Sequence, residues 1–175
     1  IAIHILWINL VTDGLPALAL GVDPANEDLM EKKPRDPDEG IFSGKMGFNI
    51  GTQGLFIGFI TLLAFYLGDS YYSLETARTM AFATLSFSQL SHALNSRSAR
   101  YSLFHIGFFT NKYLNLAIIV SASLQLAVML IGPLQNIFEV VSLTAIQWFT
   151  IIGLSLSPIL YVEIFKLLGL TYEEE

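Results

Sequence analysis

The segment NLVTDGLPAL (residues 9–18) decides how the rest of this sequence is interpreted. Asp13 is the only Asp, Glu, Lys or Arg between residues 1 and 22, and most of its neighbours are apolar. Gly14 follows it directly, and Pro16 lies two residues further on. A charged side chain at the centre of a bilayer costs about 2.5–3.5 kcal/mol on insertion scales. The segment therefore indicates a membrane helix whose carboxylate has a function.

Long runs without charged residues recur along the 175-residue chain. Only 14% of the residues are charged, whereas soluble domains carry about 25%. A membrane-spanning helix needs roughly 20 apolar residues, and a soluble helical core rarely produces five such runs. The predicted spans are residues 1–21, 46–68, 77–96, 113–132 and 145–168, with a loop at 22–45. We predict an all-α fold, a single transmembrane domain over residues 1–175 with about five spans. Because the chain opens without Met inside a hydrophobic run, we expect it to be a fragment.

The basic residues predict the orientation of this domain. Four of the nine Lys and Arg residues lie in the 22–45 loop, three lie between residues 97 and 112, and Lys166 lies near the last span's end. Only Arg78 falls on the opposite side. The positive-inside rule makes the basic side cytoplasmic. The 22–45 loop fits either a solvated linker or a surface that docks a cytoplasmic domain. The net charge of −6 gives no reason to expect nucleic-acid binding. Because the sequence has no Cys, it offers no thiolate metal site.

The residues around Asp13 provide hard oxygen donors. Asn9, Thr12 and Asp13 stand at i, i+3 and i+4, so they share one face of an α-helix. Pro16 lacks an N–H and crowds the carbonyl of Thr12, while Gly14 loosens the backbone beside it. We therefore predict a helix break at Gly14 and Pro16 that frees backbone carbonyls. Broken membrane helices occur where they line a cavity or bind something.

Three things could offset the charge of Asp13: a basic partner, protonation or a bound cation. No Lys or Arg lies deep within a predicted span. A protonated Asp13 that bonds to another helix remains an alternative. Oxygen donors without nitrogen or sulfur ligands suit calcium, magnesium or manganese better than zinc or copper. We therefore favour a cation site.

The third predicted span carries a second polar face within FATLSFSQLSHALNS (residues 82–96). Ser88, Ser91 and Asn95 fall on one strip of the helix, which should point into the bundle. Gln89 lies beside this strip, where it could offer a neutral oxygen to a cation or hold two helices together. In the second span, a series of glycines would allow close helix packing; its members are Gly51, Gly54 and Gly58.

Two segments carry a resemblance to a known family. LWINLVTDGLPALALGVDPANEDLMEKKPR resembles the sixth membrane helix and following loop of P-type calcium-transporting ATPases, and TMAFATLSFSQLSHALNSRS resembles their eighth helix. The resemblance covers essentially the whole chain and implies the C-terminal half of the membrane domain, helices six to ten. The family's phosphorylation motif DKTGT is absent from this sequence. The resemblance thus implies a parent pump whose other domains bind ATP and Mg²⁺, while this fragment alone does not hydrolyse ATP.

The resemblance also implies roles for particular residues. Asn9 and Asp13 match the calcium ligands of helix six, and Thr12 matches a ligand of the site shared with helices five and eight. Gln89 stands where the family's two-site pumps have a glutamate, and losing that charge favours one Ca²⁺ per cycle. The implied function is export of Ca²⁺ from the cytoplasm with proton counter-transport.

Several alternatives stay open at this stage. The parent could be a Mn²⁺- or Na⁺-transporting P-type ATPase, although the NxxTD pattern favours calcium over manganese. A secondary transporter or channel could also use a broken helix with an acidic residue, and a structural membrane subunit could keep Asp13 protonated. Expected partners are the lipid bilayer and the parent's remaining membrane helices and cytoplasmic domains. The absence of Cys and of a retention signal favours a bacterial plasma membrane.

Overall fold

The computed structural model describes residues 1–23, 45–98 and 101–170, and all regular elements in these ranges are helices. Most of the predicted 22–45 loop and the acidic C-terminal tail lie outside the described residues. The elements are α1 (Ala2–Trp7), η1 (Ile8–Asp13), α2 (Gly14–Leu20), α3 (Lys45–Tyr71), α4 (Leu74–Asn95), α5 (Leu103–Ile106), α6 (Lys112–Leu130), α7 (Gly132–Phe138) and α8 (Ala145–Leu167).

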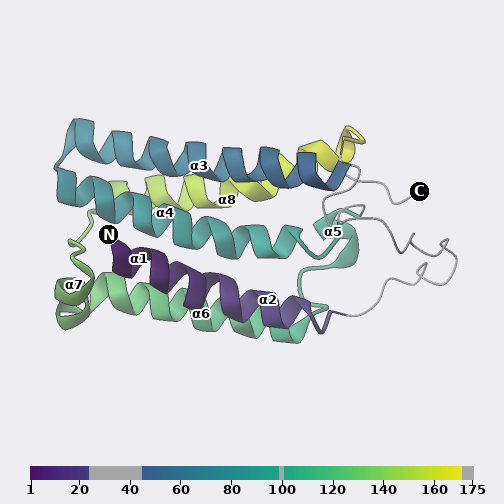
Figure 1. Ribbon diagram of the computed structural model, residues 1–175, viewed down its shortest axis with the longest axis horizontal. Coiled ribbons are helices and arrows are strands. Elements are labelled where there is room, and N and C mark those ends of the chain that lie inside the picture. The colour runs from purple at the N-terminus through teal and green to yellow at the C-terminus, as the bar shows by residue number, and fades with distance from the viewer. Residues whose placement is uncertain (24–44, 99–100, 171–175) are drawn as a thin grey trace, which may run out of the picture.

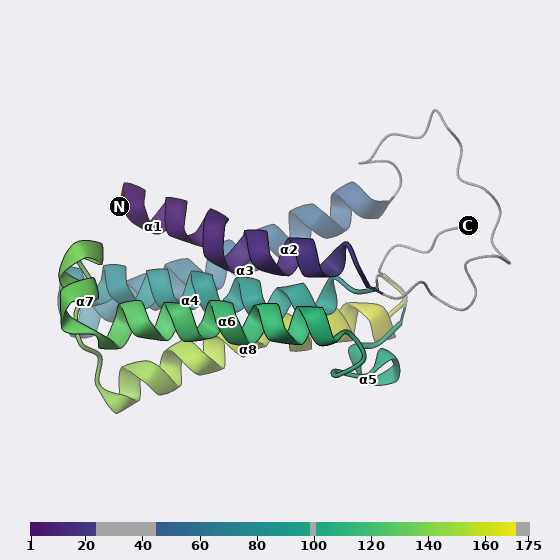
Figure 2. The same ribbon diagram turned by 90° about the horizontal axis from the view of Figure 1, so that it is seen from below.

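The long helices run along one common axis and alternate in direction (Figure 1). α1, η1 and α2 form one continuous helical segment, and α3, α4, α6 and α8 each cross the bundle once. We call the two ends of the bundle the α7 end and the Arg97 end. The short helix α5 lies at the Arg97 end, while α7 and the connection to α8 lie at the opposite end (Figures 1 and 2).

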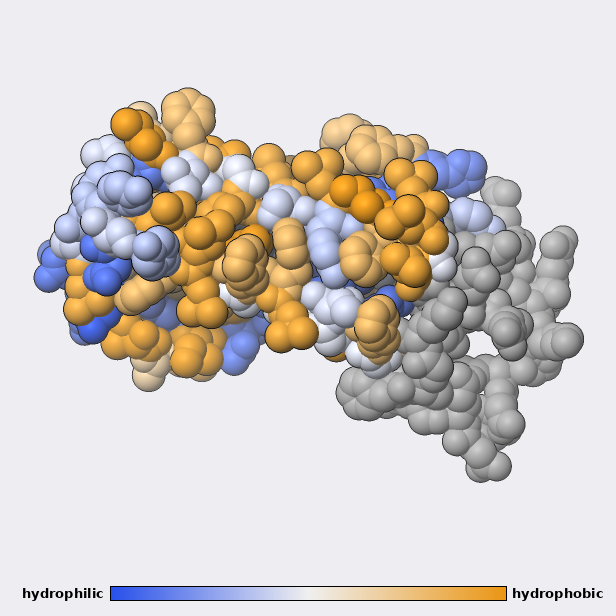
Figure 3. Space-filling view, turned by 90° about the horizontal axis from the view of Figure 1, so that it is seen from above, coloured by the Kyte–Doolittle hydropathy of each residue, from blue (hydrophilic) through white to orange (hydrophobic). Residues whose placement is uncertain are grey.

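Four helical segments are long and apolar enough to cross a membrane, judged by length and composition. They are Ala2–Leu20, Met46–Tyr71, Lys112–Leu130 and Ala145–Leu167. These correspond to four of the predicted spans. Apolar side chains also cover much of the outer surface (Figure 3), and Leu10, Leu55 and Phe149 are more than two-thirds exposed. A soluble protein rarely shows so extensive an apolar surface, so this surface suits contact with lipid.

α4 is the fifth predicted span and differs from the other four. Its 22 residues are long enough to cross a bilayer, but it is not among the segments that are apolar enough to do so alone. It packs against α3, α8, α6, η1 and α2, and its buried side chains include several hydroxyl groups. Helix neighbours therefore surround α4. Some of its polar side chains, such as Ser91 and Asn95, find partners within the protein, whereas the buried hydroxyls of Thr84 and Ser86 have none among the described residues.

The polar face of α4 bonds mainly to α8. Ser91 Oγ donates a hydrogen bond to the carbonyl of Ser155 at 2.6 Å, and Asn95 Nδ2 donates to the carbonyl of Pro158 at 3.0 Å. Ser155 Oγ in turn donates to the carbonyl of Thr84 at 3.3 Å. The prediction that this face points into the bundle is confirmed, because Ser91 and Asn95 are both buried.

A close helix approach lies at Gly68, near the turn between α3 and α4. A Cβ atom added to Gly68 would lie 2.5 Å from the Cα of Ala77. Ala64 stands one turn earlier on α3 and is fully buried, so small residues four apart let the two backbones meet. By contrast, no described residue lies within 4 Å of a Cβ placed at the three glycines that the sequence singled out.

Candidate cation-binding site

The predicted ligands of the first helix lie in a π-helical segment, η1. The chain stays helical through Gly14, whose φ and ψ are −63° and −48°, and continues as α2 through Pro16. The predicted interruption therefore takes the form of a change in helix type, which ends at Asp13, rather than a gap at Gly14 and Pro16. Figure 2 shows α1 leaving the bundle at an angle, while α2 lies along α6. π-helical turns are a recognised cause of such bends.

Asn9 and Asp13 are the most accessible of the candidate ligands. Asn9 is exposed and Asp13 is half-buried. Within residues 1–23, 45–98 and 101–170, no hydrogen bond or ion pair reaches either side chain. Their oxygen atoms are therefore available to a ligand on the side of the helix that the described chain leaves open.

Thr12 has a different environment. Its side chain is 1% exposed, and its Oγ1 donates a hydrogen bond to the carbonyl of Ile8 at 2.8 Å. π-helical hydrogen bonds join residues five apart and so widen the turn, which separates residues that share a face of an α-helix. Thr12 consequently lies deeper than Asn9 and Asp13. Its hydroxyl proton is used in the hydrogen bond to the backbone, but its oxygen can still accept a hydrogen bond.

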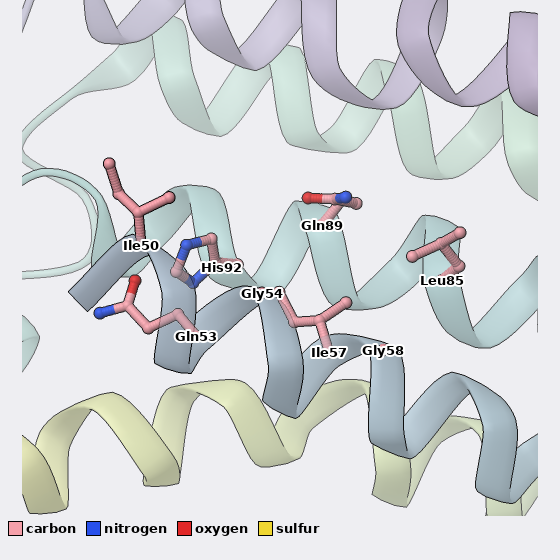
Figure 4. A pocket seen from close by; sticks show the side chains of 8 residues that line it. All are labelled: Ile50, Gln53, Gly54, Ile57, Gly58, Leu85, Gln89 and His92. Atoms are coloured by element: carbon pink, nitrogen blue, oxygen red, sulfur yellow. The ribbon is translucent and has the colours of Figure 1, made fainter. Parts of the chain in front are cut away.

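Gln89 lies on α4 and lines a pocket of about 370 Å³ between α3 and α4 (Figure 4). The pocket combines three polar side chains with apolar residues and two of the α3 glycines. Its lining residues are Ile50, Gln53, Gly54, Ile57, Gly58, Leu85, Gln89 and His92. No hydrogen bond in the described chain joins Gln89 to the first-helix candidates. The structure thus brings Asn9 and Asp13 together on one helix and places Gln89 on a helix that packs against η1.

The donor set fits a hard cation but is incomplete by itself. An amide, a hydroxyl and a carboxylate are ligands that Ca²⁺ accepts, and Ca²⁺ takes six to eight oxygens. In the part of the chain that the structure describes, no three His, Asp or Glu residues gather into a metal-binding group. Further oxygen ligands would have to come from other parts of a larger assembly.

Contacts from α6 hold the helix that carries these candidate ligands, and the sequence alone did not reveal them. Ser121 Oγ donates a hydrogen bond to the carbonyl of Val11 at 2.7 Å. One turn further along α6, Gln125 Oε1 accepts a hydrogen bond from Trp7 Nε1 at 2.9 Å. Ser121 and Gln125 are both fully buried. The spacing of Ser121 and Gln125, four residues apart in a mostly apolar span, was the available signal.

Two further contacts anchor the Arg97 end of this helix. Asn111 Nδ2 donates to the carbonyl of Ala19 at 3.1 Å. Just beyond α2, Asp23 forms an ion pair with Arg97, whose Nε lies 3.1 Å from Oδ2 and whose side chain is only 3% exposed. Arg97 also donates to the carbonyl of Gly107 at 2.8 Å. The helix with the candidate ligands is therefore fixed to α6 and to the segment between α4 and α6.

Comparison with known proteins places this arrangement in a family. A family model described as "Cation transporting ATPase, C-terminus" matches residues 1–168. Calcium-transporting ATPase 1 of Bacillus cereus is 45% identical over 182 residues, covering 94% of this chain and 20% of that protein. A calcium-transporting ATPase of Bacillus subtilis is 44% identical over 160 residues, covering 90% of this chain and 18% of that protein.

A third relative, a calcium-transporting ATPase of Listeria monocytogenes, is 36% identical over 166 residues, covering 94% of this chain and 19% of that protein. The chain thus spans about a fifth of the length of these curated relatives. The helical bundle, its lipid-facing surface and these similarities agree with the predicted fold and family resemblance. The chain belongs to the cation-transporting ATPase family, whose C-terminal membrane region it matches.

Proposed function

We propose that this chain is the C-terminal part of the membrane domain of an ATP-driven pump that exports Ca²⁺ from the cytoplasm. The observation that carries the proposal is the carboxylate of Asp13. It lies in a membrane helix at the end of a π-helical segment, beside the exposed amide of Asn9, and no described residue neutralises it. The curated relatives, which are named calcium-transporting ATPases, support calcium as the cargo.

The rest of the pump supplies what this chain lacks. We propose that other membrane helices of the parent complete the oxygen shell around Asn9, Thr12 and Asp13. Its cytoplasmic domains bind ATP and Mg²⁺ and undergo phosphorylation. The Arg97 end of the bundle faces the cytoplasm, in agreement with the positive-inside rule, and the membrane is a bacterial plasma membrane, in keeping with the Bacillus and Listeria relatives.

The proposed stoichiometry is one Ca²⁺ per cycle in exchange for protons. Gln89 offers a neutral oxygen. A site with fewer carboxylates binds fewer divalent cations or binds them with lower affinity. When the cation leaves, a proton on Asp13 would remove the cost of a bare charge in the membrane. In inside-out vesicles, calcium uptake should therefore be accompanied by a rise in luminal pH.

The test of the proposed function is the cation dependence of ATP hydrolysis by the full-length protein, comparing wild type with Asp13→Asn in the same lipid. Calcium should stimulate the wild type, and the variant should lose that response. Asp69→Asn is the matched control, because Asp69 is exposed at the far end of α3 and should not affect stimulation.

Other outcomes would redirect or end this proposal. Stimulation by Mn²⁺ or Na⁺ alone would replace calcium as the cargo. Ion flux that needs no ATP would indicate a secondary transporter or channel. A normal calcium response in Asp13→Asn would show that the carboxylate is structural.

A further inference from the structure

Pro16 removes one backbone N–H donor from the helix that carries the candidate ligands. A proline has no N–H, so in an α-helix the carbonyl four residues earlier, that of Thr12, loses its partner. In π-helical spacing, the carbonyl that pairs with residue 16 is that of Val11. Val11 lies within η1, between the candidate ligands Asn9 and Asp13. The backbone at the site therefore needs a replacement donor, because an unpaired carbonyl in hydrocarbon is costly.

Ser121 supplies a donor to the Val11 carbonyl from another helix. Its Oγ lies 2.7 Å from the carbonyl oxygen of Val11, and the serine side chain is fully buried. Val11 is itself buried, with 7% of its surface exposed, so water does not offer an equivalent partner. The hydrogen bond fixes the carbonyl at the centre of η1 relative to α6.

A second proline in the bundle shows a different solution to the same problem. Pro158 lies inside α8, where it removes the N–H that would pair with the carbonyl of Leu154. Ser157 Oγ donates to that carbonyl at 2.6 Å. The replacement donor thus comes from the same helix, and α8 keeps α-helical spacing throughout. In the helix with the candidate ligands the donor comes from α6, and the local spacing is π-helical.

The neighbouring contact with α6 strengthens this arrangement. Gln125 lies one turn after Ser121 on α6, and its hydrogen-bond partner Trp7 directly precedes η1. α6 therefore holds the first helix both at the start of the π-helical segment and at its centre. Asn9 lies between the anchored residues Trp7 and Val11. Thr12 and Asp13 directly follow Val11.

We propose that Ser121 is a positioning residue of the cation site: its hydrogen bond to Val11 holds η1 in the π-helical form that directs Asn9, Thr12 and Asp13 toward the cargo. This inference rests on the proposed function as a calcium pump. Without the bond, the backbone at Val11 relaxes and the ligands lose their common geometry. Cation affinity then falls, while ATP binding, which occurs elsewhere in the parent, does not change.

The experiment measures calcium activation of the full-length ATPase in Ser121→Ala and Ser121→Thr. Hydrogen bonds between membrane helices are modest in strength, so the calcium concentration for half-maximal activity should rise about three- to fifteenfold in Ser121→Ala. The KM for ATP and the rate at saturating calcium should match the wild type. Ser121→Thr keeps the hydroxyl and should retain wild-type calcium dependence.

Ser123→Ala is the matched control. Ser123 lies on the same helix but is exposed, and its Oγ bonds within α6 to the carbonyl of Ile119 at 2.7 Å. Its loss should leave calcium activation unchanged. Equal calcium dependence in Ser121→Ala, Ser123→Ala and wild type would overturn the positioning role. The positioning role would also be overturned if Ser121→Ala had a lower thermal stability and a lower maximal rate but an unchanged calcium dependence.

The two proposals fail in distinguishable ways. If Asp13→Asn abolishes the calcium response but Ser121→Ala does not shift it, the pump assignment stands and the role of Ser121 is refuted. If Asp13→Asn responds to calcium as the wild type does, the site assignment itself fails.

Discussion

The contact at Gly68 allows a specific test of the packing between α3 and α4. In Gly68→Ala, the new methyl carbon would lie 2.5 Å from the Cα and 2.9 Å from the backbone nitrogen of Ala77. Ordinary carbon–carbon contacts lie at about 3.5–4.0 Å, so the two helices would have to separate by roughly 1 Å. Backbone atoms cannot turn aside as a flexible side chain would.

The expected cost follows from where this contact lies. Gly68 is six residues before the start of α4, and only Tyr72 and Ser73 connect the two helices. The short connection prevents α3 from shifting independently, so the strain spreads into the buried residues around Ala64. Overpacking a core of this kind costs typically 1–3 kcal/mol. We expect a lower apparent Tm and a shorter active lifetime for Gly68→Ala.

The assay is thermal unfolding of the full-length protein in detergent, followed by the loss of its monodisperse form. Gly153→Ala is the control, since no atom of another described residue lies within 4 Å of a Cβ at this interior position of α8 and alanine favours a helix over glycine. The reasoning is refuted if Gly68→Ala is as stable as wild type while Gly153→Ala behaves as expected.

Two further predictions concern the contacts that anchor the helix with the candidate ligands. Arg97→Met should lower the apparent Tm, because it leaves Asp23 without its partner; the cost should approach the 3–5 kcal/mol typical of a broken buried ion pair. Lys112→Met, at an exposed position, should leave the Tm unchanged. Equal stability of the two variants would contradict the anchoring role of Arg97. Trp7→Phe should cost about 1–3 kcal/mol, because it leaves the Oε1 of the fully buried Gln125 without its donor. Adding Gln125→Leu to Trp7→Phe should recover most of that stability, since both polar groups are then gone; if the double variant is no more stable than Trp7→Phe, the bond is not the cause.

The sequence predicted the helices well because the information is local. Apolar runs of about 20 residues with few charged side chains mark four of the membrane segments, and the inward face of α4 follows from the spacing of Ser91 and Asn95 on a helix. These inferences need only composition and the period of an α-helix. They do not depend on which helix packs against which.

The details of the candidate site depend on contacts between distant segments, which the sequence does not reveal. Pro16 and Gly14 indicated an irregular helix, but the π-helical form of η1 is accompanied by a donor that lies 110 residues away in the chain. Likewise, glycine content alone did not identify Gly68, whose close approach arises from the short turn between α3 and α4. The ligand roles of Asn9, Thr12, Asp13 and Gln89 remain predictions.

The central position of α4 has a consequence for how the protein is made. A helix with this many buried hydroxyl groups gains little from entering lipid alone, because its partners on α8 are synthesised about 60 residues later. α3 is strongly apolar and connects to α4 through two residues. The two helices should therefore enter the membrane as one hairpin, with α3 shielding α4 until the last helix arrives. A ribosome that stalls before α8 would then expose an unfinished polar surface to lipid, which is the kind of defect that membrane quality-control proteases degrade.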